Sequence, residues 1–277
     1  MKTKSILLSS LLGASLLHAE GDANLAQQLT NPLAAMISMP VQGNVDFGIG
    51  PGGGHRMTTN IQPVVPFELS ENWNLISRTI LPVIDQQGTD PLTDRSDAFG
   101  LGDVVQSFFF SPKNPEPFIW GVGPVVLMPT ATNSVLGADK WGLGPTGVIL
   151  KIDGPWTYGM LANHIWDVGG PGKNSFDYFV LPNGVVSLNQ DVNLTFIQPF
   201  VSYTTKQATT FTMNSESTYN WATHQWTVPI NLQVSQLVKM GGAPVSIFGG
   251  VRWYAERAPQ GPDWGARFGF TLLFPKG

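Results

Sequence analysis

Charge and cysteine are what this chain has least of. Its 277 residues include no cysteine, and Asp, Glu, Lys and Arg together make up only 12% of them. A soluble domain usually carries about twice that charged fraction. Without cysteine the chain has no disulfide, no thiolate metal site and no cysteine nucleophile. A net charge of −4 gives it no basic footprint for nucleic acid, so we expect no nucleic-acid partner.

Long apolar runs are also scarce. Beyond the N-terminus, no segment reaches the roughly 20 apolar residues that a membrane-spanning helix needs. The 31 glycines and 22 prolines disfavour a helix-rich fold, because both residue types break helix interiors. Aromatic residues are plentiful, at 11%, which is unlike a disordered chain. These features together indicate a large, weakly charged β-protein.

The first 19 residues have the layout of a secretory signal peptide. Lys2 and Lys4 precede a short apolar stretch over 5–17, and Ala19 stands before a polar segment. We therefore expect 1–19 to be cleaved and the mature chain to be exported. We expect residues 20–40 to form an N-terminal segment that contains a short helix over 24–36 and folds into the lumen of the following domain as a plug. That domain spans 41–277.

Residues 41–277 divide into segments of strand length joined by links of alternating size. The predicted strands are 41–49, 56–67, 73–84, 99–111, 118–129, 141–152, 156–167, 189–203, 208–219, 225–238, 244–254 and 264–274. Short links such as 153–155 alternate with long ones such as 168–188. Short turns at one end and long loops at the other are typical of an outer-membrane barrel. We predict an all-β fold, a closed antiparallel transmembrane β-barrel of about 12 strands, over the alternative of a soluble secreted sandwich.

A period of two along these strands assigns their faces. In 225–238, Val228 and Ile230, on one apolar face with Leu232, should meet lipid, whereas Asn231 and Gln233 on the polar face should meet the lumen. Charged strand residues should face the lumen too, because an arginine on the lipid face costs about 2–4 kcal/mol at mid-depth. The lumen-lining candidates are Arg56, Asn60, Gln62, Arg78, Glu216, Asn231, Gln233, Arg252 and Arg267.

The charged candidates allow two interpretations. If they line an open pore, four arginines against Glu216 would concentrate anions in it. If they fill the barrel, they would form an internal network of salt bridges and hydrogen bonds. A barrel of this strand number is intermediate between filled small barrels and wide porins, so both interpretations stay open.

Tryptophan positions favour a membrane barrel. The nine tryptophans lie at or near the ends of the predicted strands, at Trp73, Trp120, Trp141, Trp156, Trp166, Trp221, Trp226, Trp253 and Trp264. Membrane barrels place such amphipathic rings at both headgroup levels. The positions therefore predict an aromatic girdle.

Five prolines fall inside the predicted strands, where proline removes a ladder hydrogen bond. They are Pro63, Pro124, Pro145, Pro199 and Pro229. We expect them to lie at bulges or kinks that face the lumen, where water can satisfy the unpaired carbonyl groups.

Motifs for catalysis or cofactor binding are absent from the sequence. Two matches to G-x-G-x-x-G, at 48–53 and 142–147, contain proline and precede strand-like residues, so turn glycines are favoured over a dinucleotide site. The histidines, at 18, 55, 164 and 224, have no metal-ligand spacing. None has serine two residues later, as outer-membrane phospholipases do, although a catalytic pair assembled across strands stays open. We predict no enzyme, no cofactor and no metal site.

Several phrases of the sequence resemble one family of bacterial outer-membrane proteins. They are Asn-Ile-Gln-Pro-Val-Val-Pro at 60–66, Gly-Leu-Gly-Asp at 100–103, and the stretches at 73–83, 106–112, 156–159, 163–166, 198–203 and 225–231. The likeness runs from about Leu25 to the C-terminus. The family is described as meta-pathway phenol-degradation proteins or as transporters. The resemblance implies a Gram-negative outer-membrane barrel that takes up small organic molecules, and it supplies no catalytic residues.

Three functions stay open for such a barrel. The first is a porin-like channel or transporter for small, aromatic or other organic molecules. The second is a closed structural or partner-binding barrel, and the third, more remote, is an outer-membrane lipid hydrolase. The expected partners are outer-membrane lipid, a small-molecule solute and the barrel-insertion machinery.

Overall fold

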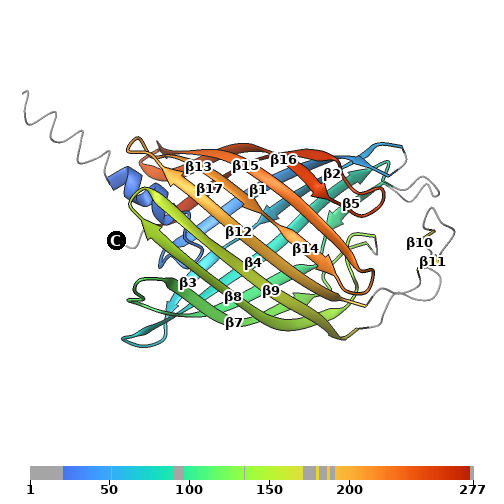
Figure 1. Ribbon diagram of the computed structural model, residues 1–277, viewed down its shortest axis with the longest axis horizontal. Coiled ribbons are helices and arrows are strands. Elements are labelled where there is room, and N and C mark those ends of the chain that lie inside the picture. The colour runs from blue at the N-terminus through green and yellow to red at the C-terminus, as the bar shows by residue number, and fades with distance from the viewer. Residues whose placement is uncertain are drawn as a thin grey trace, which may run out of the picture.

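Twelve antiparallel strands close into a barrel in the computed structural model, which confirms the predicted fold class (Figure 1). The structure describes residues 21–50, 52–89, 97–133, 135–170, 179–180, 186–187 and 191–274. The predicted signal peptide, 1–19, lies outside the described residues. Across those described ranges, no helix has the length and apolar character needed to cross a membrane.

The strands of the wall follow one another in sequence, each beside the next. Those in one piece are β1 (Ile37–Ile49), β4 (Trp73–Gln87), β7 (Ile119–Met128), β8 (Trp141–Asp153), β9 (Trp156–Gly169), β12 (Asn193–Thr204), β15 (Gln225–Met240), β16 (Ala243–Glu256) and β17 (Trp264–Phe274). The others are in two pieces, β2 (Gly54–Ile61) with β3 (Val64–Glu68), β5 (Ala98–Leu101) with β6 (Val104–Pro112), and β13 (Thr209–Ser215) with β14 (Ser217–Asn220). β10 (Phe179–Val180) and β11 (Val186–Ser187) form a separate small sheet. Each predicted strand corresponds to one strand of the wall.

The barrel closes where its first and last strands meet. β1 pairs with β17 from Ile37↔Phe274 to Phe47↔Trp264, and on its other side β1 pairs with β2. Every strand of the wall thus has a neighbour on both sides. In lipid, where no water can satisfy a free strand edge, such closure is required.

The two ends of the barrel differ in their connections. One end carries the short turns 69–72, 113–118, 154–155, 205–208 and 241–242, and we call it the short-turn end. At the opposite end, the long-loop end, β4 is followed by β5, β7 by β8 and β9 by β12, and the described loop residues there include 129–133 and 135–140. A helix over 21–28 and the C-terminal end of β17 both lie at the short-turn end (Figure 1).

Side-chain burial follows the predicted alternation. In β15, Leu232 is 52% exposed on the outer face, whereas Asn231 is fully buried. In β17, Phe268 and Phe270 are exposed, whereas Arg267, which precedes Phe268, is buried. The wall therefore presents apolar side chains outward and polar ones inward.

The prolines are where the sequence prediction was wrong. Pro124, Pro145 and Pro199 lie on the exposed outer face instead of the lumen. Each stands beside an interruption in a neighbouring ladder, so its missing N–H breaks no continuous run of bonds. Pro124 lies in a gap of the β6–β7 pairing, and Pro145 lies in a gap of the β8–β9 pairing. Pro199 lies where the partner of β12 changes from β14 to β13. Pro229 does face inward, at a register shift, and Pro63 lies between β2 and β3.

Placing an arginine on each face of β15 tests this orientation. We expect Leu232→Arg to lower the free energy of unfolding by about 2–4 kcal/mol, because residue 232 is exposed on the outer face halfway along the strand. Gln233→Arg, its matched control on the inner face, should cost much less. Urea unfolding in lipid vesicles, followed by the gel mobility of unheated samples, measures both. Equal losses would contradict the assigned faces.

Candidate functional site: the barrel interior

A band of charged side chains crosses the interior of the barrel. Arg267 on β17 donates from Nε to Asn44 Oδ1 at 2.8 Å and from Nη2 to Glu216 Oε2 at 2.6 Å. Arg252 on β16 places Nη2 3.7 Å from the same Glu216 oxygen, and its Nε lies 3.7 Å from Asp46 Oδ1. Glu216 thus bridges two arginines, and Asp46 forms a longer ion pair with the second of them, Arg252.

Two further arginines of the interior bind amides instead of carboxylates. Arg56 donates from Nε to Gln86 Oε1 at 3.0 Å, and Arg78 donates from Nη2 to Gln62 Oε1 at 2.8 Å. Neither arginine forms a salt bridge within the described part of the chain. Four arginines therefore face two carboxylates here, which leaves the band with an excess of positive charge.

The remaining predicted lumen residues also lie on inner faces. Asn231 is fully buried and donates from Nδ2 to Asn214 Oδ1 at 2.8 Å. Asn60 lies opposite Gln42 of β1, and both belong to the inward face of their strands. Gln62 and Gln233 line the cavity described next. Whether these residues line a working pore stays a prediction.

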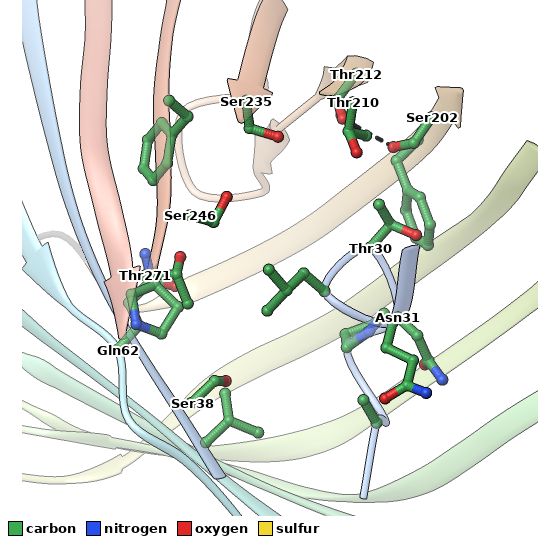
Figure 2. A pocket seen from close by; sticks show the side chains of 18 of the residues that line it. Thr30, Asn31, Ser38, Gln62, Ser202, Thr210, Thr212, Ser235, Ser246 and Thr271 are labelled. Carbon is green, nitrogen blue, oxygen red and sulfur yellow. Dashed lines mark hydrogen bonds between the residues drawn. The ribbon is translucent and has the colours of Figure 1, made fainter. Parts of the chain in front are cut away.

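A cavity of about 250 Å³ lies between the wall and the N-terminal segment. Its wall is mostly amides and hydroxyls, among them Ser38, Gln42, Gln62, Gln198, Ser202, Thr210, Thr212, Asn214, Gln233, Ser235, Ser246 and Thr271. Phe200 and Phe248 add apolar surface, and Arg78 adds a charge. Figure 2 shows Ser235, Ser246 and Thr271 on one side of this space, with Thr30 and Asn31 of the N-terminal segment facing it.

Residues 21–36 are held at the short-turn end by packing and by polar contacts. Leu33 is buried in a cluster with Ile76 and Phe109 of the wall. Gln27 Nε2 donates to Gly154 O at 2.7 Å, and Asp22 forms a 3.0 Å salt bridge with Lys239. The observed helix spans 21–28, whereas the sequence predicted 24–36. β1 begins at Ile37, so the last residues of the predicted 20–40 segment belong to the wall.

A second cluster of charges lies at the long-loop end. Lys140 Nζ, although its side chain is only 7% exposed, contacts Asp191 at 2.8 Å and Asp167 at 3.1 Å. The hydrogen bond to Asp191 is the main cause that raises the pKa of Lys140; desolvation opposes it, and the bond to Asp167 supports it. The loop 129–140 is also fixed by Asp103, whose carboxylate accepts the N–H groups of Ala131 and Ala138. These contacts tie the loop to the rim of the barrel.

Asp46 is the interior charge that the sequence reasoning left out. It lies in the predicted strand 41–49, and it alternates there with Asn44 and Gln42, all on the inward face. The same period-two rule that selected Arg56 could therefore have selected Asp46. In the predicted strand 208–219, the same period of two places Thr210 and Thr212 on one face, and both line the cavity.

The nine tryptophans all lie exposed on the outside of the barrel. Trp73, Trp120 and Trp156 begin or nearly begin strands at the short-turn end. The other six, Trp141, Trp166, Trp221, Trp226, Trp253 and Trp264, lie toward the long-loop end. An arrangement in two outer groups is the one that an aromatic girdle requires.

His164 and Thr195 form the shorter of two histidine–hydroxyl pairs among the described residues, and this pair bears on the hydrolase alternative; the other joins His224 and Tyr219 at 3.5 Å. Its Nδ1 lies 2.7 Å from Thr195 Oγ1, which also accepts a hydrogen bond from Trp221 Nε1 at 2.8 Å. A catalytic histidine needs its second nitrogen held by an orienting group. In the described part of the chain, Nε2 of His164 is buried without a partner. The described residues also contain no group of side chains suited to a metal ion. This pair therefore has the form of a structural contact among the outer aromatic rings.

Comparison with known proteins identifies the fold through solved structures. No protein-family model and no curated protein sequence matches the chain. An outer membrane channel from Pseudomonas putida F1 has a TM-score of 0.64 at 14% identity, over 87% of this chain and 97% of that one. The NanC porin has a TM-score of 0.49 at 11% identity, over 86% and 100%. Outer membrane phospholipase A from Escherichia coli has 0.47 at 11%, over 84% and 95%. The likeness to the channel from Pseudomonas putida F1, at 14% identity, shows the barrel fold alone, and the family resemblance stays a prediction.

Proposed function

We propose that this protein is an outer-membrane channel for small organic molecules. One observation carries the proposal, the polar cavity of about 250 Å³ inside a closed barrel. The strand side of this cavity is lined largely by amide and hydroxyl side chains. Such a lining can exchange hydrogen bonds with water and with a solute in turn.

The outer surface supports a membrane location. Exposed leucine, valine, isoleucine and phenylalanine side chains cover it, for example Leu143, Ile149, Leu232, Val251 and Phe268. Soluble proteins rarely expose so continuous an apolar surface. The tryptophans flank this surface toward both ends, as they do in barrels that meet lipid. The export signal predicted at 1–19 fits the same location.

The charge of the interior favours anionic solutes. Four arginines against Asp46 and Glu216 leave a positive excess, although the whole chain is negative. In a narrow space with low-dielectric walls, such an excess raises the local concentration of anions. The cavity lining combines amides and hydroxyls with apolar side chains such as Phe200 and Phe248, so it can contact both the polar and the apolar parts of a solute.

A closed structural barrel is the second candidate. The salt bridges of Glu216 with Arg252 and Arg267 cross the interior, and Leu33 fills its short-turn end. Both features narrow any path along the axis. They are compatible with a channel only if water passes around the charged band or the N-terminal segment moves.

Ion conductance in planar bilayers separates the two candidates. We expect the purified protein to give small channels that prefer chloride to potassium, read from the reversal potential in a KCl gradient. The preference should weaken at high salt, because the screening length falls from about 10 Å at 0.1 M to about 3 Å at 1 M. Cation preference would show that the arginines do not control the path. No conductance, even after removal of 21–36, would favour the closed barrel.

A further inference from the structure

Arg78 is the one charged residue among the described residues that line the cavity. Its guanidinium has five N–H donors, and the structure accounts for one of them, in the bond to Gln62. Glu216, a carboxylate of the charged band, already contacts Arg267 and Arg252. Arg78 therefore keeps unused N–H donors for whatever occupies the cavity, while its charge is shared with the more distant carboxylate of Glu216. A planar guanidinium fits a carboxylate through two parallel hydrogen bonds.

The rest of the lining is rich in hydrogen-bonding groups that the protein itself leaves unused. The side chains of Gln42, Gln198 and Gln233 make no hydrogen bond within the ranges that the structure describes, and neither do those of Ser38, Ser235, Ser246 and Thr271. Figure 2 shows Ser38, Ser235, Ser246 and Thr271 around this space. Amides and hydroxyls of this kind can both donate to and accept from the hydroxyl groups of a solute.

The size of the cavity limits the solute. A volume of about 250 Å³ lies below the roughly 300–1,000 Å³ of pockets for drug-sized ligands. A molecule of sugar-acid size is therefore the appropriate scale. Phe200 and Phe248 can cover its carbon skeleton.

We propose that this cavity is a binding site for a small hydroxylated carboxylate. Arg78 binds the carboxylate, and the amides and hydroxyls of the wall bind the hydroxyl groups. The inference rests on the proposed function in that the site would lie on the path of the solute. Binding is measurable without passage, so the two ideas can fail separately.

Gluconate and sorbitol are the matched probes for this site, because they have the same number of carbons and differ in charge. Isothermal titration calorimetry of the full mature chain in detergent should show gluconate binding, with sorbitol at least about tenfold weaker, as the loss of a charged hydrogen-bond partner implies. Arg78→Gln should weaken gluconate about 10- to 100-fold and leave sorbitol nearly unchanged. Arg78→Lys keeps the positive charge but lacks the paired N–H donors of the guanidinium. It should therefore recover part of the gluconate affinity that Arg78→Gln loses.

Arg257→Gln is the control variant. Arg257 pairs with Asp263 at the long-loop end, outside the cavity, so gluconate binding should not change. Should Arg78→Gln not fold, the unaltered protein still gives a test, because chloride should compete with gluconate and not with sorbitol. Gluconate binding that is insensitive to Arg78→Gln or to chloride would overturn the proposal. So would equal affinity for sorbitol, or benzoate binding more tightly than gluconate.

Bilayer conductance makes the two failures distinguishable. Conductance without gluconate binding would overturn this site and leave the channel standing. Gluconate binding without conductance, in the full chain and after removal of 21–36, would leave the site standing and overturn the channel.

Discussion

Replacement of Glu216 by glutamine is expected to lower the free energy of unfolding by about 3–5 kcal/mol, the usual cost of removing one partner of a buried ion pair. Glu216 contacts Arg267 at 2.6 Å and Arg252 at 3.7 Å, and the side chain of Arg267 is only 2% exposed. The amide keeps the size of the side chain and removes its charge. Two buried guanidinium groups would then share Asp46 as their carboxylate within the charged band.

Glu68→Gln provides the matched comparison. Glu68 forms a 3.3 Å salt bridge with Lys113, but its side chain is 65% exposed at the short-turn end. Exposed pairs of this kind contribute about 0–1 kcal/mol. Urea unfolding of both variants in lipid vesicles gives the two losses directly. Similar small losses would mean that water in the lumen screens the charged band.

Conductance gives Glu216→Gln a second readout. Removal of one negative charge from the interior should strengthen the preference for anions, if the band lies along the conducting path. Arg252→Gln should act in the opposite direction. It should also reduce stability, because Arg252 holds both Glu216 and Asp46. The two variants thus separate the effect of charge on selectivity from its effect on stability.

Deletion of residues 21–36 is expected to raise the single-channel conductance severalfold. These residues form one side of the cavity, and Leu33 packs against Ile76 and Phe109 at the short-turn end. Their removal leaves the strands of the wall complete, since β1 begins at Ile37. Single-channel recording in planar bilayers compares the deletion with the full mature chain.

Gln27→Ala is the control for the deletion. It removes the hydrogen bond to Gly154 O but keeps the segment and its packing through Leu33, so conductance should stay near that of the full chain. A deletion variant that folds and conducts like the full chain would contradict the idea of a plug. If the deletion removes conductance, the segment must support the open path and not obstruct it.

The alternation of side chains was sufficient to predict the wall of this barrel. Strand number, the parity of the links and the faces of Leu232 and Asn231 all follow from a period of two, which is a local property of the chain. The contacts of Glu216 do not, because they depend on the register of β13 to β17. The cluster of Lys140, Asp167 and Asp191 likewise joins residues from separate loops and strands. Sequence periodicity identifies the inner face but not the partners on it.

The prolines illustrate a different limit. A proline in a strand signals a missing donor, but not the side of the wall on which the ring lies. Pro124 and Pro145 pair with each other across β7 and β8 on the outer face, beside interruptions in the adjoining ladders. The interruptions are a property of two strands together, so one strand's sequence does not reveal them.

The pairing of β1 with β17 also determines when the barrel can finish folding. It joins Ile37 to Phe274, close to the two limits of the described chain. Contacts between such distant residues carry a high loop-closure entropy and form slowly. Until the last strand arrives, β1 keeps a free edge that can pair with other chains. The paired ends of β1 and β17 meet at the short-turn end, and every strand of the wall has an antiparallel neighbour on each side. The same wall could therefore form with the termini of the chain at a different turn. A circularly permuted chain, with a short linker from 274 to 37 and new termini at another short turn, retains every neighbour relation of this wall.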